Sequence, residues 1–211
     1  MLGEWYGYVA REVGNALLLR PNLDVTFAQL ELITASIGLL VAISMLAGQS
    51  VILAINKVRG FAYSFLVLLT GLRVLAIVAV LTTTLWLLGL VSGTVADIPT
   101  MTHVVLLSLS PHLFAFVAIA PGIGPFLSRA LTAWSFLILW PASAQAFRTD
   151  IWTALLISLT AGVITLSIMH LLGRPVATVR DRLWRRVTGR ELRRSSRELL
   201  EETGLLEAGR D

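Results

Sequence analysis

Three histidines are the side chains of this sequence best suited to acid–base chemistry or metal binding near neutral pH: His103, His112 and His170. A metal site needs several His, Asp or Glu side chains that converge on one point. The sequence has no H-E-x-x-H motif and no pair of carboxylates within an apolar segment. His103 and His170 lie near the ends of apolar segments, where interfacial side chains are expected. We therefore predict neither a metal site nor enzymatic activity.

His112 differs from the other two histidines because it follows Pro111 inside an apolar run, where its ring needs a hydrogen-bond partner. The expected partner is a backbone carbonyl that the proline leaves without a donor. The alternative is that this lone buried histidine ligates a porphyrin-type pigment. No other cofactor is predicted.

The remaining polar side chains within apolar sequence could line the path of a permease or channel, or bond one helix to another. A secondary transporter generally carries inverted repeats and polar groups near the membrane midplane. This sequence has no internal repeat and no acid deep in an apolar segment. Hydrogen bonds between helices, and arginines that reach the headgroups, are therefore favoured. Together with His112, the set comprises Gln49, Asn56, Arg73 and Arg129.

The stretch APGIGP, residues 120–125, could be a phosphate-binding loop or a chain reversal. A phosphate-binding loop follows a strand and carries its full glycine spacing ahead of a helix, and this stretch does neither. Proline cannot continue a helix interior, and glycine accepts the positive φ that a reversal needs. The stretch therefore predicts a tight hairpin at the aqueous edge of a membrane.

The composition indicates which elements hold these side chains. The chain has 211 residues, of which 56% are hydrophobic and only 14% charged, and its mean hydropathy is +0.80. A soluble domain carries about a quarter charged residues, so this chain lacks the polar surface of a water-exposed globule. It has no cysteine and therefore no disulfide. The sequence predicts an integral membrane protein.

About 20 apolar residues are needed for a helix to cross the hydrocarbon core of a bilayer. Five segments satisfy this length: Glu31–Gly48 or as far as Asn56, a segment within 61–93, Met101–Ile119, Phe126–Phe147 and Trp152–Leu172. The second segment is longer than one crossing needs. If its span runs from about Val74 to Val91, Arg73 lies at the inner interface and the segment around Lys57, Arg59 and Gly60 forms a protruding hairpin.

The predicted fold class is all-α: a polytopic bundle of about five transmembrane helices with amphipathic helices at both ends. The N-terminal segment, residues 1–28, has its apolar positions on one helical face, with Glu4, Arg11, Glu12 and Asn15 opposite. It is predicted to lie on the membrane surface. The bundle comprises residues 29–173, and a basic cytoplasmic tail comprises residues 174–211.

Orientation follows from the basic residues of the short loops, which favour the cytoplasmic side. Lys57, Arg59 and Arg129 fall on one side of a five-span arrangement. The loops on the other side hold Asp97 in one case and Arg148 with Asp150 in the other. This places the C-terminus in the cytoplasm and the N-terminus outside. The membrane is predicted to be the bacterial inner membrane or an internal membrane.

Small residues at four-residue spacing allow helix backbones to approach closely. They occur in the first span and the fifth, as Ser44 with Gly48 and as Ala154, Ser158 and Gly162. These faces could pack inside the bundle or against another membrane protein, and packing inside the bundle is favoured.

The tail combines an apolar face with many arginines directly after the last span. This pattern is typical of a helix that binds anionic lipid headgroups. Docking to a partner protein, or a role only in topology, are the alternatives. Nucleic acid is not expected as a partner, because the helix is tethered to a span and no binding fold accompanies it. The candidate contact residues are Arg180, Arg182, Trp184, Arg185, Arg186, Arg190, Arg193 and Arg194.

The order of motifs resembles one known family. A helix entered through SPH (residues 110–112) is followed by IAPGIG, then LTAW, then PASAQAFRTDIWTALL and a helix rich in small residues. Over residues 30–172 this order is similar to the Ypt-interacting protein (Yip) family, in particular its compact bacterial members. The resemblance implies a five-helix membrane fold. Eukaryotic members are associated with vesicle traffic and prenylated small GTPases, but GTPase binding is not implied here, because the N-terminal segment and its expected orientation differ from the family pattern.

The favoured function is therefore that of a non-enzymatic membrane protein that organises lipid and protein contacts. The first alternative is an accessory subunit of a larger membrane complex, for example an energy-converting or photosynthetic one. The second alternative is a small permease or channel. Anionic lipids and other membrane protein subunits are the expected partners.

Overall fold

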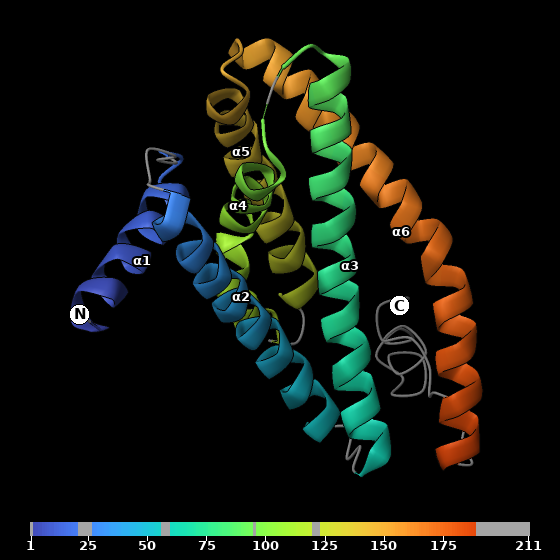
Figure 1. Ribbon diagram of the computed structural model, residues 1–211. Coiled ribbons are helices and arrows are strands. Elements are labelled where there is room, and N and C mark those ends of the chain that lie inside the picture. Colours follow the sequence, from blue (N-terminus) through green and yellow to red (C-terminus); the bar gives the residue numbers. More distant parts are fainter. Residues whose placement is uncertain (1, 21–26, 56–59, 95, 120–122, 189–211) are drawn as a thin grey trace, which may run out of the picture. The chain divides into compact units, whose positions relative to one another are not determined.

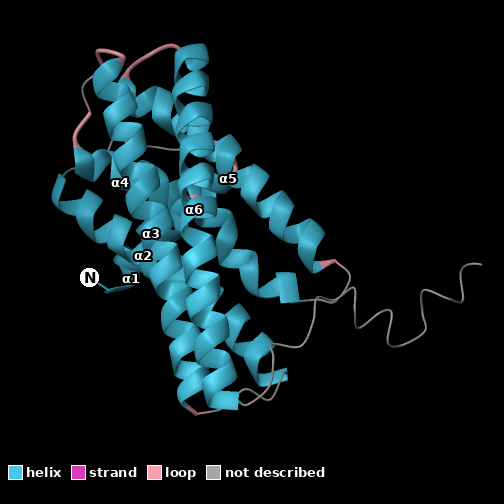
Figure 2. Ribbon diagram, turned by 90° about the vertical axis from the view of Figure 1, so that its right-hand side faces the viewer, coloured by secondary structure: helices cyan, strands magenta, loops and turns pink. Residues whose placement is uncertain are grey.

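Helices make up all of the regular structure in the described part of the chain. The computed structural model describes residues 2–20, 27–55, 60–94, 96–119 and 123–188. Within these ranges there are helices and loops but no strand (Figures 1 and 2). The predicted all-α class is thus confirmed. The elements are α1 (Leu2–Leu17), α2 (Phe27–Ile55), α3 (Phe61–Val91), α4 (Ile98–Ser108), the 3-10 helix η1 (Ser110–Ile119), α5 (Gly124–Phe147) and α6 (Ile151–Thr188).

The chain divides into two units, Met1–Met169 and His170–Asp211, with the boundary inside α6. The first unit holds α1 to α5, η1 and the first part of α6. Within it, α4 and α5 lie side by side, α4 contacts both α2 and α3, and η1 packs on α2 and α5 (Figure 1). The second unit holds the rest of α6, which ends at Thr188.

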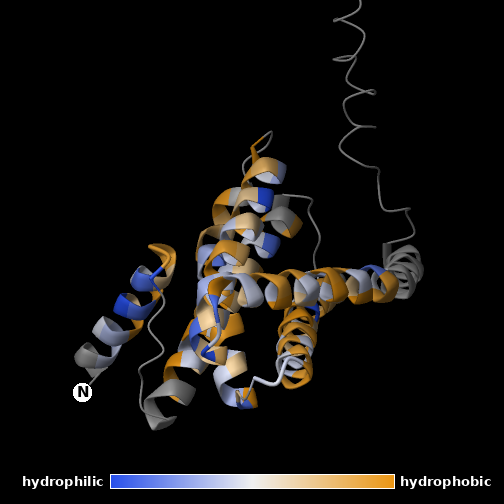
Figure 3. Ribbon diagram, turned by 90° about the horizontal axis from the view of Figure 1, so that it is seen from above, coloured by the Kyte–Doolittle hydropathy of each residue, from blue (hydrophilic) through white to orange (hydrophobic). Residues whose placement is uncertain are grey.

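Four helical stretches of the described residues are long and apolar enough to cross a membrane: Leu32–Val51, Tyr63–Val91, Ile98–Val117 and Ile151–Gly173. Many large hydrophobic side chains of these helices are exposed. Coloured by hydropathy, the helices are mostly hydrophobic, whereas α1 carries both hydrophilic and hydrophobic residues (Figure 3). These helices indicate an integral membrane protein. Four of the five predicted spans coincide with them.

The predicted fourth span, Phe126–Phe147, lies within α5 but is not among these four stretches. The helix itself is 24 residues long, so length is sufficient. Its polar residues and its internal proline lower its hydropathy. They include Ser128, Arg129, Thr132, Pro141 and Gln145.

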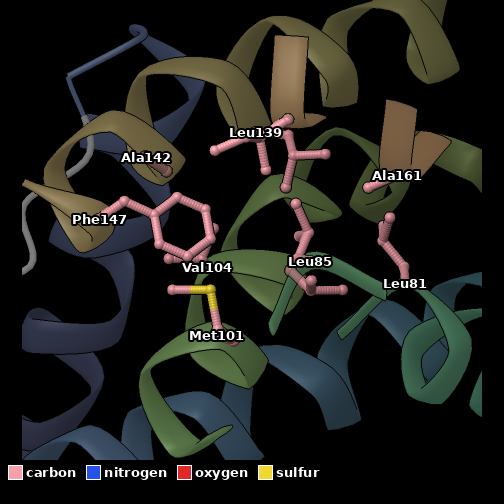
Figure 4. Close-up of a cluster of buried hydrophobic side chains, with 10 residues drawn as sticks. Leu81, Leu85, Met101, Val104, Leu139, Ala142, Phe147 and Ala161 are labelled. Carbon is pink, nitrogen blue, oxygen red and sulfur yellow. The ribbon is translucent and has the colours of Figure 1, made fainter. Parts of the chain in front are cut away.

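Two clusters of buried apolar side chains hold the first unit together. The first cluster joins α3, α4, α5 and α6 (Figure 4). Its members are Leu81, Leu85, Met101, Val104, Val105, Leu139, Ala142, Phe147, Ile157 and Ala161. The second cluster joins α1, α2, α4 and α5 through Val9, Ala16, Ile33, Ile37, Val41, Leu107 and Ile138. Burial of α1 in the second cluster means that its apolar face contacts other helices, whereas the sequence predicted that it faces lipid.

The third span changes its helix type part of the way along, a change that the hydropathy pattern does not predict. Pro111 has no N–H group, so the carbonyl of Leu107 loses its α-helical donor. The Ser110 hydroxyl donates to that carbonyl at 2.6 Å instead. From Ser110 onwards the chain continues as the 3-10 helix η1.

Contacts between α2 and the third span place these two segments parallel to one another. The Thr34 hydroxyl lies 2.7 Å from Nδ1 of His103, and the Ser44 hydroxyl donates to the Leu113 carbonyl at 2.7 Å. Both contacts join residues 69 positions apart, so α2 and α4–η1 advance in the same direction with the same register. This register decides which side chains of the two segments meet.

Candidate functional site

The pair Thr34–His103 is the most deeply buried polar contact between two helices of the described bundle. His103 is fully buried, and its Nδ1 lies 2.7 Å from the Thr34 hydroxyl, which is also buried. His103 is one turn before Leu107 on α4, and Thr34 lies between Ile33 and Ile37 on α2. The apolar neighbours therefore place both polar groups in the second cluster. The prediction that His103 is interfacial is wrong, because the first turns of α4 are covered by α2.

The other ring nitrogen of His103 is also inside the protein. Nε2 is buried and has no hydrogen-bond partner among the residues that the structure describes. A buried polar atom without a partner is uncommon, because its desolvation is not offset by a hydrogen bond. A polar group placed beside Nε2 would offset this cost.

His112 is bonded to a side chain and not to the carbonyl that the proline frees. Its Nδ1 lies 3.1 Å from the hydroxyl of Ser135 on α5, whereas the Leu107 carbonyl accepts from Ser110. The pair His112–Ser135 thus links η1 to α5. Ligation of a pigment by His112 stays a prediction.

Glu12 of α1 is a second buried group, although its place in the helical repeat predicts it opposite the apolar face. Only 2% of its surface is exposed, and its Oε2 has no hydrogen-bond partner in the described residues. Desolvation by burial raises the pKa of the Glu12 carboxyl above its ordinary value, and the charge of Arg11 opposes this rise. Glu12 is buried on the same face of α1 as Val9 and Ala16. The buried face of α1 is therefore rotated relative to the face that its apolar residues alone would form.

The predicted intramembrane polar residues do not form one site. Arg73 is exposed on α3, Arg129 is exposed in the first turns of α5, and Gln49 is half-buried on α2. No hydrogen bond joins these three to one another in the described ranges. Asn56 lies outside the described residues.

The predicted small-residue faces lie in different surroundings. A Cβ atom at Gly48 would be 3.5 Å from Cα of Phe116, so this position of α2 lies against the backbone of η1. On α6, Ala154 and Ser158 are buried. A Cβ atom at Gly162 would have nothing within 4 Å, so this part of the α6 surface is open.

The candidate residues of the tail are only partly covered by the structure. Positions 180, 182, 184, 185 and 186 belong to α6, which ends at Thr188, but their side chains are outside the described residues, as are Arg190, Arg193 and Arg194 altogether. The turn at 120–122 and the hairpin residues Lys57 and Arg59 are outside them too.

No group of three or more His, Cys, Asp or Glu side chains that could hold a metal ion occurs in the part of the chain that the structure describes. The polar side chains that the fold brings into hydrogen bonds between helices are Thr34 with His103 and His112 with Ser135, within the described ranges. Glu12 is buried on α1 without such a partner among the described side chains. Spacing in the sequence could not have revealed these pairs, because 69 and 23 positions separate the bonded residues.

Replacing Thr34 by valine is expected to destabilise the bundle by about 1–3 kcal/mol, because Nδ1 of His103 is then buried without its partner. Thr132→Val is the matched control, since the exposed Thr132 hydroxyl bonds only to the Ser128 carbonyl of its own helix. Unfolding of the purified variants in mixed detergent micelles measures the difference. Equal stability of the two variants would contradict the structural role of the pair.

Together, four helices able to cross a membrane and a bundle held by apolar clusters define the class: an α-helical integral membrane protein. No protein-family model, no curated protein and no solved structure matches this chain.

Proposed function

We propose that this protein is a non-enzymatic integral membrane protein that organises lipid and protein contacts, as the resemblance to compact Yip-like proteins suggests. The observation that carries the proposal is the length of α6, which runs for 38 residues from Ile151 to Thr188. Its apolar part ends at Gly173, and the same helix then continues through the arginine-rich positions 174–188. Arginines joined to a span in this way remain close to the headgroups, where anionic lipid attracts them.

A role as an accessory subunit is the second candidate, and the surface of α6 favours it. The exposed side chains of α6 are large and apolar. Among them, a Cβ atom at Gly162 would have nothing within 4 Å, so the helix surface is open there. Helices of a partner subunit approach closely at such small residues. The exposed positions of α6 around Gly162 are Leu156, Leu159, Val163 and Leu166.

We further propose that α5 is the fourth of five spans and that the C-terminus faces the cytoplasm. An odd number of spans puts the two ends of the chain on opposite sides of the membrane. The acids Asp97 and Asp150 then fall in external loops, and the basic tail lies inside. In the structure, Asp150 caps α6 by accepting hydrogen bonds from the backbone N–H groups of Trp152 and Thr153.

The test is to identify the lipids and proteins that co-purify with this protein from the membrane. Full-length protein purified in mild detergent is expected to retain anionic lipids above their share in the parent membrane, because the basic segment binds them. Mass spectrometry of the retained lipids and proteins measures this. A stoichiometric protein partner would favour the accessory-subunit role. Retained lipid of the same composition as the parent membrane, without any protein partner, would refute the proposal.

A further inference from the structure

The buried face of α1 contains one ionisable side chain. Val9, Glu12 and Ala16 lie at helical spacing, and their exposed fractions are 5%, 2% and 0%. Val9 and Ala16 belong to the second cluster. Because residues three and four positions apart share a helix face, Glu12 enters the interface between its two apolar neighbours.

The surface opposite this face is almost entirely apolar. In the second cluster α2 contributes Ile33, Ile37 and Val41, and α4 contributes Leu107. None of these side chains can accept a proton or offer one to a carboxylate. Oε2 of Glu12 has no hydrogen-bond partner within the described ranges.

Few charged or titratable groups face Glu12 from the elements that pack on α1, which are α2, α4 and η1. Among the described side chains, α2 presents Thr34, α4 presents His103, and η1 presents His112. The two histidines are bonded to Thr34 and to Ser135 through Nδ1. On α1 itself Arg11 is exposed, and its Cζ lies 4.6 Å from the centre of the Tyr8 ring. Among the described side chains, therefore, no cation bonds to the Glu12 carboxyl.

A carboxylate in such surroundings is far more costly to bury than a neutral carboxylic acid. The membrane surface is an alternative position for α1. Tyr6 and Tyr8 are exposed, and Arg11 lies against the Tyr8 ring. Aromatic and basic side chains suit the headgroup layer. On the membrane surface the Glu12 carboxylate would be hydrated, so the ionised form of the side chain is stable there.

We propose that Glu12 is a proton-binding site that couples the docking of α1 to its protonation: α1 packs on the bundle when the carboxyl is neutral and moves to the membrane surface when it ionises.

The direction of the pH dependence follows from the burial. Burial raises the pKa of Glu12 in the docked state, and Arg11 opposes this to a smaller extent. A group whose pKa is raised on docking contributes fully below its undocked pKa, and this contribution is lost as the pH rises through the docked pKa. Between the undocked and the docked pKa the docking constant falls by up to about tenfold per pH unit, because undocking releases one proton, and above the docked pKa it levels off. Protonation of His103 or His112 would act in the opposite direction and would loosen the contact at low pH.

Cysteine labelling of the full-length protein tests the proposal, since the chain has no cysteine of its own. Val9→Cys places a thiol on the buried face of α1, and Ala10→Cys places one on the exposed face. In lipid nanodiscs, the ratio of their maleimide labelling rates cancels the pH dependence of the thiol. We expect this ratio to be low in acid and to rise by up to about tenfold per pH unit. When Glu12→Gln is added to both cysteine variants, the ratio of labelling rates should stay low at every pH.

Hydrogen exchange of α1 supplies a second measurement that does not alter the buried face. At any one pH the native chain and Glu12→Gln have the same intrinsic exchange rates away from position 12, so their ratio reports docking alone. Faster exchange in the native chain, growing with pH, supports the proposal. A labelling ratio independent of pH, a rise of equal size in Glu12→Gln, or a rise towards low pH would overturn it, and the last result would assign the response to a histidine.

Discussion

Neutralising four arginines after the last span is expected to lower the affinity for anionic lipid by up to about 10³-fold. Each basic residue near the membrane surface contributes about 1 kcal/mol of attraction, and every 1.4 kcal/mol is a factor of ten. The four positions to be changed to glutamine are Arg180, Arg182, Arg185 and Arg186. Titration of a fluorescent anionic lipid into the purified full-length protein measures the loss.

The matched control replaces the same four arginines by lysine. The attraction is electrostatic, so lysine should retain most of the binding, whereas a bidentate contact would require arginine. Raising the salt concentration should weaken binding of the native protein, because the Debye length falls from about 10 Å at 0.1 M to about 3 Å at 1 M. If zwitterionic lipid binds equally well, or the glutamine variant binds as tightly as the native chain, the tail is not a lipid-binding element. Docking to a protein partner is then favoured.

Replacing Gly89 by alanine is expected to destabilise the first unit by about 1–3 kcal/mol, which is typical of overpacking a filled core. A Cβ atom at Gly89 would lie 2.5 Å from Cε1 of Phe147 and 3.1 Å from the hydroxyl of Thr94. The ring cannot move aside freely, because Phe147 is a buried member of the first cluster (Figure 4). The Thr94 hydroxyl is also held, since it donates to the Gly89 carbonyl at 2.9 Å.

Gly71→Ala is the control on the same helix, because a Cβ atom there would meet nothing within 4 Å. It should leave stability unchanged or raise it slightly, since alanine favours the helix. Adding Phe147→Leu to Gly89→Ala should recover part of the loss by removing the ring. Detergent-induced unfolding of the purified variants compares them. Equal effects of alanine at positions 89 and 71 would mean that the contact with Phe147 does not limit packing.

The sequence by itself determined the helical class, four of the spans and the concentration of arginines after the last one. These properties are local, because hydropathy over about 20 residues decides whether a helix can replace water by lipid. They also sufficed to locate α1 as a helix. Its polar and apolar positions follow the helical repeat closely enough for this, even though Glu12 was assigned to the wrong face.

Only the tertiary structure decided which polar groups are buried and which groups they bond to. The periodicity of α1 put Glu12 opposite the apolar stripe, but packing on α2, α4 and η1 buries Glu12 together with Val9 and Ala16 of that stripe. His103 looked interfacial from its place near the start of an apolar segment, yet α2 covers it and Thr34 bonds to it from 69 positions away.

The break between α4 and η1 has the same origin. Pro111 predicts a carbonyl without its helical donor, but the sequence does not say which group replaces that donor. Ser110, three residues along the same segment, donates to the Leu107 carbonyl, whereas only the fold brings Ser44 of α2 to the Leu113 carbonyl. Segment hydropathy is a sum over neighbours along the chain, whereas a buried hydrogen bond depends on the register of two helices, which packing alone decides.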